Sequence, residues 1–185
     1  MRLIRNSVLG VCVLAALAVA PTAVFADDHG VPITGSFTVL AARPAAPSPI
    51  TGPYCAGGIG TPFEAQGIGS VSKLGPMFLT VKKCLTVVNG QGTYVGTFTM
   101  TAGDGDTLEG RYDGTVVLSS VDENGFRPFQ GTLTFTGGTG RFVHARGALS
   151  FTAVASPLST GVTVPTANLM AFYLVQGNMV SPGRN

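Results

Sequence analysis

Charged and metal-ligating residues are scarce in this 185-residue sequence. It contains two histidines, three cysteines and no tryptophan, and charged residues make up only 11% of it. It has no nucleophile elbow and no zinc-ligand spacing, which argues against a hydrolase or a metalloenzyme. We therefore expect no metal and no cofactor. The two histidines, His29 and His144, are expected to be exposed loop residues.

The N-terminal 26 residues have the pattern of a cleaved secretory signal. Two arginines precede an apolar run from Val8 to Ala20, and a small-residue site ends at Ala26. The run is too short to span a bilayer and is closed by Pro21. Cleavage would leave 159 residues, the size of one domain, with nine basic and nine acidic side chains. We expect a secreted or periplasmic single domain at 27–185, with neither a nucleic-acid partner nor membrane insertion.

Cys55 and Cys84 are the two cysteines that remain after the signal. In an exported chain, two cysteines are most simply one disulfide. No CxxC spacing exists and no histidine lies nearby in the sequence, so a redox pair or a metal site is the weaker alternative. We predict a structural bridge.

The rest of the chain is rich in threonine, valine and phenylalanine with a period of two, and glycine or proline interrupts it every several residues. This pattern is typical of short antiparallel strands with one buried face. It predicts an all-β fold, a closed antiparallel barrel of about eight strands, with a sandwich as the alternative. The predicted strands are residues 33–40, 63–73, 77–88, 97–101, 108–119, 132–136, 148–153 and 168–180.

One set of alternating apolar side chains is expected to face the interior of this barrel. These candidate ligand-lining residues are Phe98, Met100, Tyr112, Leu133, Phe135, Leu149 and Phe151. They could equally form a solid core, since an eight-stranded barrel is just wide enough for either arrangement. The opposite face, with Glu109, Arg111 and Asp113, is expected to be solvated.

The glycine-rich segment TGGTGRF at 136–142 raises the question of a phosphate-binding loop. A P-loop needs a Lys-Ser or Lys-Thr pair after its glycines, and a dinucleotide fingerprint needs a βαβ setting; both are missing. We predict a structural corner, with Gly137, Gly138 and Gly140 in a tight bend, Arg141 on its surface and Phe142 plugging the barrel end. The nearby Asp-Gly-Asp at 104–106 is expected to be hairpin chemistry, since the later glutamate of a calcium loop is absent.

The last predicted strand, 168–180, differs from the others because residues 169–175 are apolar on both faces. Such a strand needs cover on both sides. Either the proline-rich loop at 43–53 lies across its outer face, or the strand forms a homo-oligomer interface.

Two motifs carry a resemblance. The segments GTFTMTAGDGDTLEGRYDGTV at 96–116 and GTLTFTGGTGRFVHARGALSFTA at 131–153 resemble a family of small exported bacterial proteins with a GTGRF corner. That family is similar to the allene oxide cyclase and dirigent barrels, which implies eight antiparallel strands, frequent trimers and an apolar cavity. His144 and Arg146 replace the small residues that commonly follow the corner, and the resemblance identifies no catalytic residue here.

Three functions are compatible with these features. The first is binding of a small hydrophobic molecule inside the barrel. The second is a cyclase or isomerase acting on a hydrophobic substrate, which would require a buried polar group such as Tyr112, Tyr173 or Glu109. The third is a structural or interaction module. An outer-membrane barrel is disfavoured because the sequence has no tryptophan and only four tyrosines, whereas such barrels usually show aromatic girdles.

Overall fold

The computed structural model describes residues 30–42, 55, 60–157 and 169–180. Within them, eight strands form one closed barrel in which each strand is antiparallel to the next, and this confirms the predicted fold class. The expected signal peptide and proline-rich loop lie outside the described residues. The strands are β1 (Val31–Ala42), β2 (Thr61–Val71), β3 (Gly75–Val88), β4 (Gln91–Ala102), β5 (Thr107–Val117), β6 (Arg127–Gly138), β7 (Arg146–Pro157) and β8 (Leu169–Val180).

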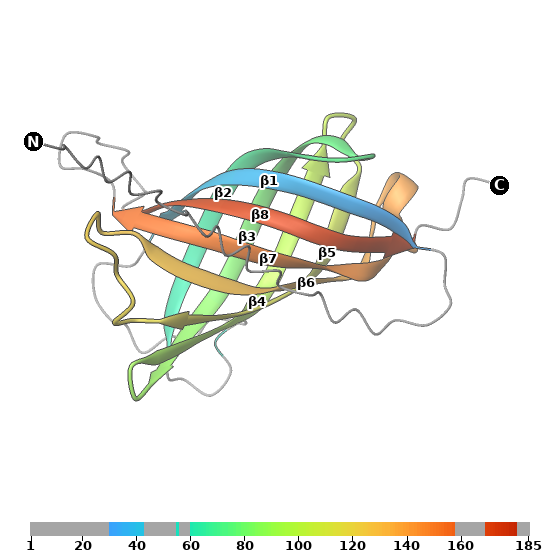
Figure 1. Cartoon of the computed structure of the whole chain (residues 1–185). Coiled ribbons are helices and arrows are strands. Elements are labelled where there is room, and N and C mark those ends of the chain that lie inside the picture. Colours follow the sequence, from blue (N-terminus) through green and yellow to red (C-terminus); the bar gives the residue numbers. More distant parts are fainter. Residues whose placement is uncertain (1–29, 43–54, 56–59, 158–168, 181–185) are drawn as a thin grey trace, which may run out of the picture.

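The barrel closes where the first strand pairs with the last. Figure 1 shows β1 in blue beside β8 in red, and their register places Val39 opposite Ala171. Because every strand has two neighbours, the described sheet has no open edge on which another strand could add.

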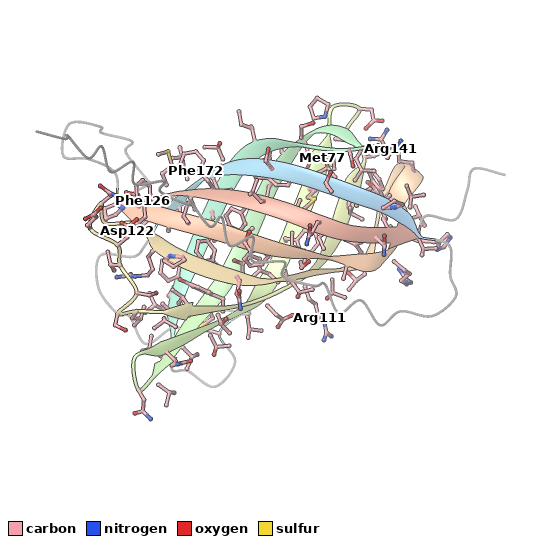
Figure 2. All side chains as sticks on the ribbon, viewed as in Figure 1. Met77, Arg111, Asp122, Phe126, Arg141 and Phe172 are labelled. Atoms are coloured by element: carbon pink, nitrogen blue, oxygen red, sulfur yellow. A yellow bond between two sulfur atoms is a disulfide. The ribbon has the colours of Figure 1, made fainter. Side chains whose placement is uncertain are left out.

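The two ends of the barrel differ in what closes them. At one end, which we call the corner end, a 3-10 turn (η1, Gly140–Phe142) follows β6. At the other end, which we call the lysine end, lie the β3–β4 turn and the 118–126 connection. Figure 2 shows Arg141 at the corner end and Asp122 and Phe126 at the lysine end.

Three observed strands, β4, β6 and β7, extend well beyond the predicted ones, because glycines near their ends were interpreted as breaks. The clearest case is β4, predicted as 97–101 and observed as Gln91–Ala102. Gly96 pairs with Lys83 on β3, and a Cβ atom at Gly96 would lie 2.6 Å from the Lys83 Cα atom. Glycine is therefore needed inside this strand for close approach of its neighbour. The turn between β3 and β4 is formed by Asn89 and Gly90, which both have positive φ, as this pair of residues favours in a hairpin.

The glycine-rich segment forms the predicted corner. Gly137 and Gly140 have φ of +140° and +52°, and Phe142 is 1% exposed within the core. Arg141 binds the Asp-Gly-Asp turn between β4 and β5: its Nη1 lies 3.3 Å from Asp104 Oδ2, and its backbone N–H donates to Asp106 Oδ2 at 3.0 Å. The Asp104 and Asp106 carboxylates therefore bind Arg141 and hold the corner against the β4–β5 turn.

The predicted disulfide joins Cys55 and Cys84. Cys84 lies on β3 next to the inward residue Lys83, so its own side chain belongs to the outer face of the wall. The bridge therefore ties the segment before β2 to the outside of the barrel, as suits a protein of an oxidising compartment. Among the described residues, no helix has the length and apolar character needed to cross a bilayer.

Candidate functional site

The most unusual buried residue of the barrel is a lysine. Met77, Leu79 and Val81 occupy alternate inward positions of β3, and the same alternation turns Lys83 inward. Lys83 is 5% exposed, and it is the one charged side chain that is fully buried among the residues the structure describes. Burying a lysine ammonium costs free energy unless nearby groups stabilise its charge. The side chains around Lys83 therefore decide its protonation state.

Aromatic rings from three strands surround the Lys83 amine. Its Nζ atom lies 4.1 Å from the ring centroid of Tyr94, 4.7 Å from that of Tyr112 and 5.1 Å from that of Phe129. These distances lie within the range of cation–π attraction. Phe151 and Tyr173 pack against these rings. We call the five packed rings of Tyr94, Tyr112, Phe129, Phe151 and Tyr173 the aromatic chamber.

The rings of the chamber also pack against each other. Tyr112 and Phe151 have centroids 5.1 Å apart, and Tyr173 lies 5.3 Å from both Phe129 and Phe151. Tyr94 contacts Tyr112 and Phe129 at 6.5 and 6.1 Å. These separations are typical of favourable edge and tilted pairs, so the chamber holds its polar groups in a defined geometry.

Three polar atoms meet inside this apolar shell. The Lys83 Nζ donates to Tyr112 Oη at 3.2 Å and lies 3.5 Å from Tyr173 Oη. The two tyrosine oxygens are 3.4 Å apart. An amine and two hydroxyls within hydrogen-bond reach form a small donor and acceptor network that could hold one polar group of a ligand.

Burial shifts the protonation of all three groups towards the neutral form. It lowers the pKa of Lys83 from 10.5 to about 7, because removal from water penalises the ammonium. Burial also raises the pKa of Tyr112 and of Tyr173. No aspartate or glutamate occupies an inward position of the eight described strands, so no carboxylate restores the lysine charge. Near neutral pH a large fraction of Lys83 is therefore a free amine.

A second basic residue lies at the mouth of the lysine end. Arg127 begins β6 on the same face as Phe129, two residues away, and its Nε is buried without a hydrogen-bond partner among the described residues. Burying a hydrogen-bond donor without an acceptor costs free energy, and an acceptor atom on a bound ligand would remove this cost. Among the rings around the Lys83 amine, Tyr94 is only partly buried, and its centroid lies 4.1 Å from the Nζ atom.

The seven predicted lining residues do face the barrel interior. Each is at most 3% exposed and belongs to the hydrophobic core. Phe98 and Phe135 pack in the corner half with centroids 6.0 Å apart, whereas Tyr112 and Phe151 belong to the aromatic chamber. The set is therefore divided between the corner half of the barrel and the chamber.

Of the three polar groups expected for an enzyme, the structure buries two. Tyr112 and Tyr173 are brought together, whereas Glu109 is exposed on the outer face of β5, the face on which it was predicted to be solvated. Arg111 and Asp113 share that outer face, as predicted, and Figure 2 shows Arg111 pointing away from the barrel. His144 is exposed, whereas His29 lies outside the described residues.

Lys83 was missed because the run 77–88 was interpreted as one strand without assigned faces. The signal was present in the sequence: the adjacent residues Lys82 and Lys83 must point to opposite faces of a strand. Because Met77, Leu79 and Val81 set the inward register, Lys83 is the lysine that turns in.

The outer wall also carries a groove of about 710 Å³ across β4 to β8. Most of its lining side chains, including Thr93, Asp113 and Gln130, are exposed, which places it outside the barrel. It is open to solvent and has no buried charged group, so the chamber is the stronger candidate site.

The outer face of β8 is apolar, as the sequence indicated. Phe172 is 43% exposed and Leu174 is 66% exposed. Phe172 pairs in register with Thr38 and Val154, and Ile68 lies beyond Thr38 on β2, so exposed apolar side chains continue across neighbouring strands. The proline-rich loop proposed to cover this face lies outside the described residues.

The described residues thus define a closed eight-stranded antiparallel barrel with a lysine and tyrosine cluster in an aromatic chamber. Comparisons with known proteins add no relative to this description: no family profile matches the sequence, and no curated protein matches it significantly.

Proposed function

We propose that the protein is an exported barrel that binds a small, mostly apolar molecule at the lysine end. The observation that carries this proposal is the position of the Lys83 amine, buried among aromatic rings and hydrogen-bonded to Tyr112. Apolar walls with a few convergent polar groups are the usual composition of small-molecule sites. The resemblance to allene oxide cyclase and dirigent barrels and the signal-like N-terminus agree with this function and location.

The chamber selects for a molecule with one hydrogen-bond acceptor, such as a carbonyl or carboxylate oxygen. Lys83, Tyr112 and Tyr173 can all donate a hydrogen bond, and Arg127 adds a donor at the mouth. The inward positions carry no carboxylate that would repel an acceptor. Entry requires the partly exposed Tyr94 ring to move aside, after which the ligand body takes its place against Phe129.

A polarity-sensitive naphthyl ketone tests this proposal, with the same fluorophore lacking the carbonyl as the comparison. We expect saturable binding with blue-shifted emission, and the ketone binding about fivefold more tightly, since one hydrogen bond contributes about 1 kcal/mol. Lys83→Met should remove the preference for the ketone, whereas Lys82→Met, which changes the exposed neighbour, should keep it. Absence of saturable binding by either fluorophore would exclude the function.

A second candidate function is proton-transfer isomerisation of a hydrophobic substrate, and the pairing of Lys83 with Tyr112 favours it. A neutral amine can accept a proton while a neutral phenol donates one. Conversion of a β,γ-unsaturated ketone to its conjugated isomer can be followed by ultraviolet absorbance. If the protein is an isomerase, it should convert this ketone, and Lys83→Met should abolish the turnover. Binding of such ketones without turnover would favour the first function.

A further inference from the structure

We propose that Lys83 is a covalent capture site for aldehydes: its amine condenses with the aldehyde of an apolar molecule bound in the aromatic chamber and forms an imine. This inference rests on the proposed binding function and names the substrate class for the same chamber. It is carried by the placement of the Lys83 Nζ atom, which lies among the rings of Tyr94, Tyr112 and Phe129 and within reach of two hydroxyls.

An uncharged amine is the first requirement of this chemistry, because only the lone pair of the neutral form attacks a carbonyl. Lysines reach that state near neutral pH when a hydrophobic pocket removes them from water. Lys83 is 5% exposed, and the titratable side chains that contact its amine among the described residues are Tyr94, Tyr112 and Tyr173. None of these is an acid that would hold the amine as an ammonium ion.

The second requirement is a proton donor for the carbonyl oxygen. The Lys83 Nζ attacks the aldehyde carbon, and a proton passes from nitrogen to oxygen to give a carbinolamine. The hydroxyl then leaves as water, taking the second amine proton, and a C=N bond remains. Tyr112 Oη, 3.2 Å from the amine, and Tyr173 Oη, 3.4 Å from Tyr112 Oη, are placed to relay these protons. No oxidant or reductant is needed, and hydrolysis reverses the reaction.

The apolar shell favours the neutral imine once it has formed. A protonated iminium would be a buried cation, and the inward positions supply no carboxylate counter-ion. The rings of Phe129 and Phe151 are placed to contact the apolar body of the aldehyde and to limit the access of bulk water. The barrel would therefore hold an aldehyde in a protected and releasable form.

The chain offers an unusually clean test, since its three lysines are Lys73, Lys82 and Lys83. Lys73 and Lys82 are exposed, so they are internal references for unspecific reaction. The purified protein is incubated at pH 7 with trans-cinnamaldehyde, and samples taken at intervals are treated with sodium borohydride, which reduces a neutral imine to a stable amine. Peptide mass mapping over time then reports the modified lysine.

We expect the Lys83 adduct to form at least about tenfold faster than adducts at Lys73 or Lys82. An ordinary lysine with a pKa near 10.4 is only about one part in 10³ neutral at pH 7. Tyr94→Ala should speed the reaction at Lys83 by opening the mouth, and Lys83→Arg should remove that adduct. Because the three lysines compete within one folded wild-type protein, the result does not depend on any variant folding.

Faster modification of Lys73 or Lys82 than of Lys83 in the folded protein would overturn the proposal. Methyl cinnamate, which has a similar shape but cannot form an imine, separates this failure from failure of the binding function. Saturable quenching of tyrosine fluorescence by methyl cinnamate, with no Lys83 adduct from the aldehyde, rejects capture and keeps binding. Absence of both rejects both.

Discussion

The Nζ atom of Lys83 on β3 lies 3.2 Å from the hydroxyl oxygen of Tyr112 on β5, inside a barrel that buries no other charged side chain among the described residues. The strand between them, β4, carries Gly96 opposite both residues, so no side chain separates the amine from the phenol. The contact between the amine and the phenol therefore depends on the pairing of β3, β4 and β5 in the barrel wall.

The stability of the protein should rise between pH 7 and about pH 10. In this window the unfolded chain keeps a proton on Lys83, whereas the folded barrel, where the pKa is about 7, has released it. The free energy of unfolding therefore increases by about 1.4 kcal/mol per pH unit. Above about pH 10 the sign reverses, because burial raises the pKa of Tyr112 and Tyr173 and the unfolded chain loses those protons first.

Urea unfolding at a series of pH values measures this profile. Lys83→Met should remove the rise between pH 7 and 10 and keep the fall above it, while Lys82→Met should leave the whole profile unchanged. A wild-type profile that is flat from pH 7 to 10 would contradict the assignment.

The corner should depend on the Asp106 carboxylate. Asp106→Ala removes the hydrogen bond from the Arg141 backbone N–H and should lower the free energy of unfolding by about 2 kcal/mol, the usual range for a bond to a charged group. Gly140→Ala should also destabilise, because φ is +52° and its Cβ would collide with the Asp106 carboxylate. Gly103→Ala, where a Cβ meets no atom within 4 Å, is the matched control.

The disulfide should stabilise the barrel without shaping the chamber. It closes a 30-residue segment from Cys55 to Cys84, for which the loop-entropy estimate is about 3 to 4 kcal/mol. The double variant Cys55→Ser and Cys84→Ser should lose about that much stability in urea unfolding, while the Lys83 pKa changes little. A large change in the Lys83 pKa would show that the bridge also holds the site.

The exposed apolar face of β8 should promote self-association. Analytical ultracentrifugation over a range of protein concentrations should show oligomers, and Leu174→Asp, which places a charge on a residue that is 66% exposed, should shift the distribution to monomer. Thr97→Asp, on the exposed outer face of β4, which lies four strands away from β8 around the barrel, is a control for added charge. A wild-type protein that is monomeric at all concentrations would reject this interface.

The fold was predictable because period-two alternation and turn chemistry act locally. The Asn89-Gly90 turn and the GTGRF corner determine where the chain reverses, and each demands backbone conformations that glycine supplies. The strand ends were less predictable, because whether Gly96 breaks a strand or makes room for Lys83 depends on the partner strand.

The site was only partly predictable for a related reason. The inward direction of Tyr112 follows from its own strand, but its contact with Lys83 and Tyr173 joins residues 29 and 61 positions away. These residues come together only when the barrel closes, so no short sequence motif reveals their contact. The exposed position of Glu109 shows the converse, since period-two alternation within its own strand correctly places it on the face opposite Tyr112.

The most direct test of the account is the pKa of Lys83 in the folded protein, measured by NMR titration of lysine side chains enriched with ¹³C at Cε. With three lysines in the chain, Lys83→Met identifies the resonance by its disappearance. We expect a midpoint for Lys83 near pH 7. A midpoint near the ordinary lysine value of about 10.4 would mean that the amine is solvated or paired, and would contradict the buried neutral lysine on which the proposed binding and aldehyde capture depend.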